Sequence, residues 1–188
     1  MKSSVAALLL FVTTSCFGQS WEAEIIAGTS GYKGDLIQHH FALRSMRSAV
    51  GVNLKYNFDN AILLRGGISW LKVTGDDKYN KKVDLRARNL NFKSDIIEAS
   101  LCVEYNLLEP EIFDAYPYIF GGIGVYHFNS YTYDDSNKKA NLRPLSTEGQ
   151  GLAAYPGRKP YSQTQFCLPF GAGWKWNFSK RCDLIYEI

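Results

Sequence analysis

The three histidines are the side chains best suited to acid–base chemistry near neutral pH. His39 and His40 follow Asp35 in one polar stretch, and His127 precedes Asp134 in another. A site built from a nucleophile, a histidine and an acid needs these groups at fixed mutual distances, and it is recognised by that geometry rather than by composition. No spacing in the chain sets such distances, so we predict solvated histidines, no catalytic residues and no enzyme.

Two further patterns match chemical sites only in part. The run Gly121 to Gly124 has the glycines of a phosphate loop but lacks the following helix and Lys-Ser/Thr pair, and strand glycines more often mark bends. Cys102, Cys167 and Cys182 show no CxxC or Cys/His spacing. We therefore predict neither a metal nor a cofactor.

The N-terminus has the pattern of a secretory signal peptide. Lys2 precedes an apolar run from Val5 to Val12, and small residues then end at Gly18, which predicts cleavage before Gln19. A lipoprotein modified at Cys16 is the alternative, although the usual preceding leucine is missing. We therefore expect residues 1–18 to be a signal peptide and residues 19–188 to form one exported domain.

Strict two-residue alternation is the main structural signal in the exported part. It recurs in seven segments: Trp21–Thr29, Ala49–Phe58, Ile62–Trp70, Ile96–Leu107, Tyr116–Phe128, Gln165–Phe178 and Cys182–Ile188. One face of each strand is apolar, and the phase of the fifth segment is ambiguous. The opposite face carries small residues and a few charges, which we expect to pair inside a crowded lumen: Lys55, Arg65, Glu98, Glu104 and Lys175.

Alternation of this kind also suits a soluble sandwich or a soluble ligand-binding barrel. A water-facing surface would carry more Lys and Glu than the small-residue face does, and the apolar face often ends in aromatic residues such as Tyr56, Trp70 and Trp176. Aromatic residues at strand ends are typical of membrane interfaces. The fold class predicted is therefore all-β, as a transmembrane barrel rather than a soluble one.

The connections between these segments alternate in length. Short turns lie at 59–60, 108–115 and 179–180, whereas the links at 30–48, 74–93 and 129–163 are long and polar. Outer-membrane barrels pair short periplasmic turns with long outer loops, and single-chain bacterial barrels have an even number of strands, at least eight. We therefore expect an up-and-down antiparallel barrel of eight strands with no open pore, whose last strand is missing after Ile188.

Charge excludes some partners. The chain has 21 Lys and Arg against 18 Asp and Glu, a net charge of +3, which points to no nucleic acid. The charged run from Asp76 to Lys93 mixes signs, so a solvated loop is favoured over a lipopolysaccharide-binding patch. Outer-membrane lipid is the partner that the predicted fold itself requires.

The loop from Leu142 to Ser162 is rich in Pro, Gly and aromatic residues, and ordered loops of this length are usually functional or packed. With Pro169–Gly173, Tyr32–Leu36 and Tyr118–Gly124, it resembles the small outer-membrane β-barrel family that includes PorG of the type IX secretion system. The residues of this signature outer loop are Pro144, Thr147, Glu148, Gly149, Gln150, Gly151, Arg158, Lys159, Pro160 and Tyr161.

The resemblance implies a non-enzymatic component or accessory of type IX protein secretion and gliding, in contact with a periplasmic lipoprotein ring. Such a contact would use the acidic turn that carries two apolar residues: Glu109, Pro110, Glu111, Ile112 and Phe113. A turn lying against the barrel rim explains the same residues. A barrel with an adhesive or envelope-stabilising role through its long outer loops remains the alternative function, and a loop-borne enzyme is a third.

Overall fold

The structure is a computed structural model that describes residues 13–18, 21–32, 45–77, 83–88, 90–133, 138–146, 150–151, 155, 157, 160–179 and 182–188. Its strands are β1 (Thr13–Gly18), β2 (Trp21–Ser30), β3 (Arg47–Asn57), β4 (Ile62–Asp76), β5 (Asn91–Asn106), β6 (Ala115–Tyr133), β7 (Lys139–Asn141), β8 (Thr164–Cys167), β9 (Phe170–Ser179) and β10 (Cys182–Glu187). The helices are α1 (Val83–Arg88) and a 3-10 turn (Arg143–Leu145).

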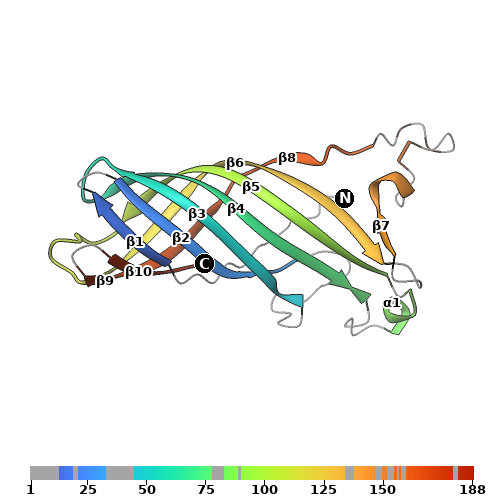
Figure 1. Ribbon diagram of the computed structural model, residues 1–188, viewed down its shortest axis with the longest axis horizontal. Coiled ribbons are helices and arrows are strands. Elements are labelled where there is room, and N and C mark those ends of the chain that lie inside the picture. Colours follow the sequence, from blue (N-terminus) through green and yellow to red (C-terminus); the bar gives the residue numbers. More distant parts are fainter. Residues whose placement is uncertain are drawn as a thin grey trace.

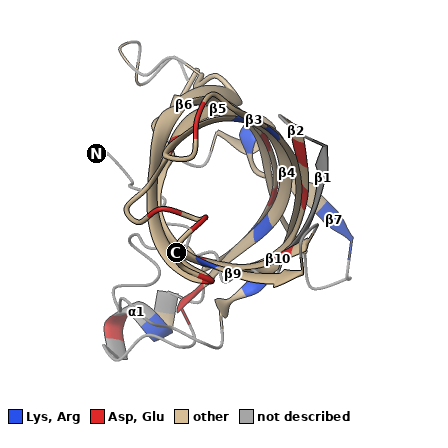
Figure 2. Ribbon diagram, turned by 90° about the vertical axis from the view of Figure 1, so that its left-hand side faces the viewer, with Lys and Arg blue, Asp and Glu red and all other residues tan. Residues whose placement is uncertain are grey.

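The strands form one antiparallel sheet that closes on itself. The hydrogen-bonded order is β5-β4-β3-β2-β1-β10-β9-β6-β7, and β5 also pairs with β6 along most of its length. Figure 1 shows the tilted strands from the side, and Figure 2 shows the closed ring from the end that carries the short turns. The predicted up-and-down antiparallel β-barrel is confirmed as the fold.

The ring has two ends of different character, as the connection lengths predicted. The turns after β3, β5 and β9 lie at one end, which we call the short-turn end, whereas α1 and β7 lie at the other, the long-loop end (Figure 1). Strands β4, β5 and β6 extend further toward the long-loop end than predicted, to Asp76, from Asn91 and to Tyr133. The predicted boundaries were wrong because the backbone ladder continues past the last apolar residues, as in the pair Asp76 and Asn91.

The predicted strand Gln165–Phe178 is interrupted. The structure divides it into β8 and β9 on either side of Leu168 and Pro169, although both parts pair with β6 in one continuous register. Proline has no N–H to donate to a ladder. Its carbonyl still accepts a hydrogen bond from the N–H of Gly122 at 2.9 Å, so the strand direction is preserved across the break.

The eighth position of the ring is taken by β1, which lies between β2 and β10. Its residues, Thr13–Gly18, fall inside the segment predicted to be a signal peptide. Seven strands had been predicted from the exported part of the chain, and all seven are present. Cleavage before Gln19 stays a prediction, and it would remove β1 and leave β2 and β10 each with one unpaired edge.

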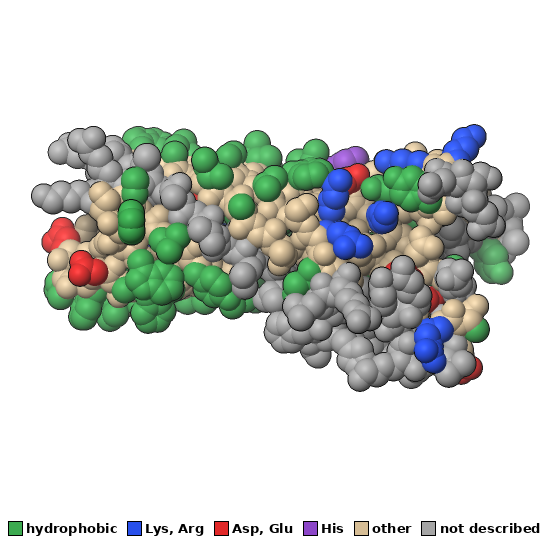
Figure 3. All heavy atoms as spheres, turned by 60° about the horizontal axis from the view of Figure 1, so that its bottom comes forward, with side chains coloured by type: hydrophobic (Ala, Val, Ile, Leu, Met, Phe, Trp, Pro, Cys, Tyr) green, Lys and Arg blue, Asp and Glu red, His purple; other side chains and the backbone are tan. Residues whose placement is uncertain are grey.

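The alternation places charged and small residues inside and large apolar residues outside. In β2, buried Glu22, Glu24 and Ile26 alternate with exposed neighbours, and β6 resolves its ambiguous phase by turning Tyr116 and Tyr118 inward. Figure 3 shows apolar side chains covering the outer wall, with basic side chains gathered toward the long-loop end. Within the described residues, no helix is long and apolar enough to cross a membrane.

Candidate functional site

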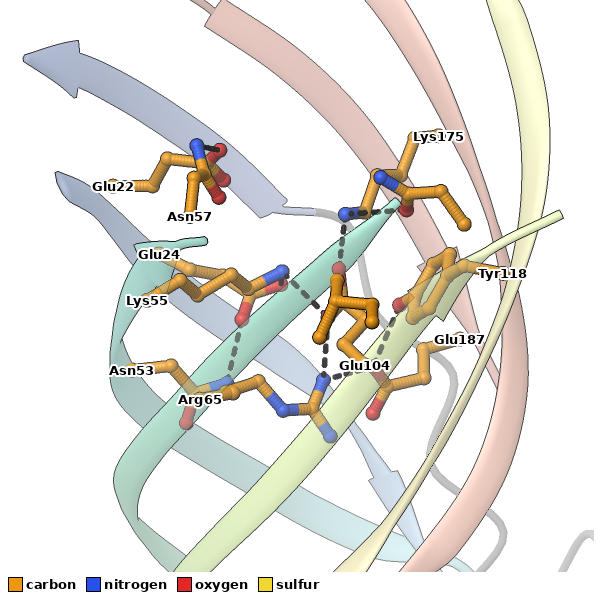
Figure 4. Close-up of polar contacts among 12 residues, drawn as sticks. Glu22, Glu24, Asn53, Lys55, Asn57, Arg65, Glu104, Tyr118, Lys175 and Glu187 are labelled. Atoms are coloured by element: carbon orange, nitrogen blue, oxygen red, sulfur yellow. Dashed lines mark hydrogen bonds and ion pairs between the residues drawn. The ribbon is translucent and has the colours of Figure 1, made fainter. Parts of the chain in front are cut away.

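An ionic network crosses the lumen and links strands from every side of the ring (Figure 4). Three cations meet three carboxylates there, and each comes from a different strand: Glu24 from β2, Lys55 from β3, Arg65 from β4, Glu104 from β5, Lys175 from β9 and Glu187 from β10. Each side chain points inward because it stands at an inward position of the two-residue alternation. The strand registers bring these positions to the same level.

Glu104 is the centre of this network and is fully buried. Its carboxylate lies 3.1 Å from the Lys55 ammonium and 3.7 Å from the Arg65 guanidinium, and it also accepts a hydrogen bond from Lys175. Buried charges are costly unless they are paired and hydrogen-bonded. Glu104 therefore shares its negative charge with cations from three strands, β3, β4 and β9.

The other two carboxylates have neutral hydrogen-bond donors beside their cations. Glu187 accepts hydrogen bonds from Arg65 at 2.5 Å and from the Tyr118 hydroxyl at 2.6 Å. Glu24 lies 3.4 Å from the Lys55 ammonium and accepts a hydrogen bond from the Asn53 amide at 2.5 Å. The network is thus a core of paired charges that occupies the middle of the lumen, as expected of a barrel of this size.

Glycines make room for the large inward side chains. A Cβ atom at Gly173 would lie 2.5 Å from the ring of Tyr118, whose side chain is fully buried. A Cβ atom at Gly67 would meet the amide of Asn53 in the same way. The small residues of the inward face are therefore required by the size of their neighbours, and they crowd the lumen as predicted.

Toward the long-loop end the lumen becomes apolar. Ala49, Leu71, Val73 and Ile96 form a buried cluster there, and Phe128 packs against it. The ring of Tyr161, from the signature outer loop, stacks on Phe128 at 5.8 Å with an interplanar angle of 11°. The loop therefore contributes to the packing at this end of the lumen.

Other parts of the signature outer loop are described only in places. Pro144 lies in the exposed 3-10 turn, Gln150 is buried, and Gly151 has φ 74°, which favours glycine. Pro160 lies next to Gly151, at 3.5 Å from where a Cβ atom would stand. The remaining predicted loop residues lie outside the described residues: Thr147, Glu148, Gly149, Arg158 and Lys159.

At the short-turn end, next to the ionic network, the barrel has an open cavity of about 700 Å³. We call it the short-turn cavity. Residues of all three short turns and of the lowest inward positions line it: Glu22, Asn57, Phe58, Asp59, Asn60, Leu63, Asn106, Pro110, Asp114, Tyr116, Lys175, Asn177, Ser179 and Asp183. Four of these residues are acidic and one is basic, so the cavity is strongly negative.

The predicted partner-contact turn borders this cavity. The carbonyl of Glu109 accepts the N–H groups of Ile112 and Phe113 at 3.1 Å, which fixes a compact turn, and Pro110 lines the cavity. Ile112 is 67% exposed and Phe113 is 45% exposed. Glu111 accepts a hydrogen bond at 2.9 Å from Asn60, which joins two neighbouring short turns.

Among the described residues, the histidine and cysteine side chains considered for chemistry do not come together in one site. His127 lies on the outer face of β6 and contacts the Thr164 hydroxyl at 3.1 Å, whereas His39, His40 and Asp134 lie outside the described residues. Cys102 and Cys167 are free thiols. In the described part of the chain, no cluster of His, Cys, Asp or Glu is arranged to hold a metal ion.

Four of the five charged residues predicted to pair inside the lumen belong to the network: Lys55, Arg65, Glu104 and Lys175. The fifth, Glu98, is half-buried and forms no ion pair within the described residues. Glu24 and Glu187 were not predicted as network members, nor Glu22 and Asp183 as cavity residues. Their signal was available, because all four stand on the inward face of alternating segments.

Comparison with known proteins places the chain in a family without assigning an activity. No curated protein and no solved structure matches the chain. The model of one family, described as "Domain of unknown function (DUF6089)", matches residues 2–184. This match covers nearly the whole chain, and the protein therefore belongs to the DUF6089 family.

Proposed function

We propose that this protein is a non-enzymatic integral barrel of the outer membrane, and that it serves as a structural component or accessory of type IX protein secretion. The short-turn end faces the periplasm in this proposal, and the long-loop end faces outward. Export by the predicted signal peptide delivers the chain to the membrane. The location in the outer membrane and the binding of a secretion partner are separate claims and are tested separately.

The apolar outer wall is the observation that most directly supports a location in the outer membrane. Large hydrophobic side chains are exposed on the outer face of every strand from β2 to β6 and from β8 to β10: Trp21, Ile25, Val50, Val52, Leu54, Ile62, Ile68, Trp70, Ile97, Leu101, Val103, Tyr105, Ile119, Ile123, Val125, Phe166, Phe170, Trp174, Trp176, Phe178 and Leu184. Charged side chains are meanwhile buried inside. This distribution is the reverse of a water-soluble protein.

The physical reason is that water disfavours a continuous apolar surface. Contiguous exposed apolar patches beyond a few hundred Å² mark membrane or protein interaction sites. The ring that includes β1 satisfies its backbone hydrogen bonds internally, which is the condition for strands to lie in hydrocarbon. A lipid bilayer therefore fits the whole outer wall, whereas a protein partner would have to surround it.

The acidic turn at 109–113 supports the proposal of a periplasmic protein partner. Its apolar residues Ile112 and Phe113 are exposed at the short-turn end, beyond the wall that lipid would cover. Exposed apolar groups on a turn with a fixed backbone are suited to docking. The resemblance to the family that includes PorG indicates a periplasmic lipoprotein ring as the binding partner.

The test is a pull-down of the tagged, full-length protein from detergent-solubilised outer membrane, with the co-purifying proteins identified. We expect ring lipoproteins to be recovered with the native protein. The double variant I112S/F113S loses them, because it removes the exposed apolar surface of the turn. L145S is the matched control, since Leu145 is equally exposed but lies at the long-loop end.

The two parts of the proposal fail in different ways. Recovery of the protein in the soluble periplasmic fraction would contradict the location. Recovery in the outer membrane without ring proteins would contradict the secretion role and leave the location intact. A role in adhesion or envelope stability would then be favoured if the long-loop variant, and not the turn variant, reduced cell attachment.

A further inference from the structure

Two carboxylates in the short-turn cavity have no cation of their own. The three buried cations of the lumen are matched by Glu24, Glu104 and Glu187. Glu22 and Asp183 are buried as well, at 5% and 4% exposure, and both line the cavity. They therefore place two negative charges in the barrel beyond those that the ionic network neutralises.

Among the described residues, neither carboxylate forms an ion pair with a cation. Lys175 is the only basic residue among the described residues that line the cavity, and its ammonium group is held by Glu104 and by Asn106 at 3.2 Å. Glu22 accepts a single hydrogen bond, from the amide of Asn57 at 2.7 Å. Asp183 has neither a hydrogen bond nor an ion pair within the described residues, although burial of an unpaired carboxylate is costly.

Two neutral groups that line the cavity also have no hydrogen-bond partner in the described structure. The Asn57 carbonyl oxygen is buried without a hydrogen-bond partner. The buried Tyr116 lines the cavity, and its hydroxyl has no partner in the described structure. A guest that brings several N–H donors and a positive charge would satisfy these acceptors and both carboxylates at once.

We infer that the short-turn cavity binds the guanidinium group of an arginine side chain presented by a partner protein. Guanidinium carries five N–H donors in a planar fork and pairs strongly with carboxylates. The volume of about 700 Å³ exceeds the needs of a single ion, and the described carboxylates are not arranged to hold a metal. The volume of the cavity lies within the range of about 300–1,000 Å³ that is typical of small-ligand sites.

The inference deepens the proposed function, and it rests on that function only for the identity of the partner. The cavity is bordered by Pro110 of the predicted partner-contact turn. A periplasmic segment that docks on Ile112 and Phe113 would therefore have the cavity within reach of its next side chains. The binding chemistry itself belongs to the chain and can be measured without the partner.

The experiment uses the purified full-length protein in detergent micelles and a fluorescein-labelled hexapeptide with one arginine. A peptide with citrulline in place of arginine is the control, because it keeps the shape and loses the charge. We expect arginine to bind about 30-fold more tightly than citrulline, the effect of losing a buried charge pair. Fluorescence anisotropy gives the two dissociation constants.

Two variants test whether the arginine peptide binds in the short-turn cavity. D183N and E22Q each remove one carboxylate and keep its shape, so each is expected to weaken arginine binding at least tenfold. D183N is also expected to unfold at the same temperature as the native protein or a higher one, because it removes an unpaired buried charge. D84N, which removes an exposed charge in α1 at the long-loop end, is expected to leave both quantities unchanged.

Equal binding of the arginine and citrulline peptides would overturn the inference. Native-like arginine binding by D183N and E22Q would overturn it as well, as would displacement of the arginine peptide by Ca²⁺ alone at micromolar concentration, which would make the cavity an ion site. Failure of peptide binding by a barrel recovered from the outer membrane contradicts only this inference. Binding by a protein recovered from the soluble periplasm contradicts only the proposed location.

Discussion

At the residue scale, the stability of this barrel depends on charged side chains that are buried in its lumen. Glu104 contacts Lys55, Arg65 and Lys175, and all four are at most 6% exposed. A buried ion pair adds little over an apolar core, but removal of one partner leaves an uncompensated charge. The network therefore makes the fold depend strongly on a few side chains.

The variant E104Q tests this dependence. It keeps the shape of the side chain but leaves three buried cations to share two carboxylates, so we expect a loss of about 3–5 kcal/mol in the free energy of unfolding. Urea unfolding in detergent, followed by tryptophan fluorescence, measures the change. The exposed-turn variant E109Q should stay within about 0.5 kcal/mol of the native protein. Equal stability of E104Q and native protein would show that the network does not hold the barrel together.

At the element scale, the fit between neighbouring strands depends on glycines that face large side chains. In G173A the new methyl group meets the buried ring of Tyr118, which must move away from Glu187. Overpacking of this kind costs about 1–3 kcal/mol. Gly121 is the matched control, because a Cβ atom there meets nothing within 4 Å. We expect G173A to lower the unfolding midpoint and G121A to leave it unchanged or raise it, and the reverse order would contradict the packing described.

The sequence predicted the elements well because alternation is a local property. The inward positions of Lys55, Arg65 and Lys175 could be predicted from their own strands. The role of Glu104 could not, because its contact with three strands depends on registers that no single strand encodes. The pairing of Arg65 with Glu187 depends further on closure of the ring between strands that are distant in sequence.

The remaining differences also have local causes. The break between β8 and β9 follows from Pro169, whose effect on the ladder was overlooked within an otherwise regular alternation. Strand β4 continues past Trp70 through the inward Leu71 and Val73 and then through Thr74, Gly75 and Asp76, which still pair with β5, so the apolar periodicity ended before the backbone pairing did. Strand β1 falls in a segment that its composition assigns to export rather than to the fold.

At the scale of the whole molecule, we propose that the outer wall of the barrel lies in lipid. The four tryptophans of the chain, Trp21, Trp70, Trp174 and Trp176, all face outward and are 38–53% exposed. They lie on β2, β4 and β9, and thus on separate parts of the wall. Tryptophan fluorescence therefore reports directly on the medium that surrounds the barrel.

The most direct measurement is quenching of this fluorescence in the protein reconstituted into liposomes with brominated acyl chains. We expect strong quenching by the brominated lipid and weak quenching by aqueous iodide, because the indole rings contact the hydrocarbon and interfacial layers. Strong quenching by iodide with none by brominated lipid would show that the apolar wall faces water or protein, and would contradict the account.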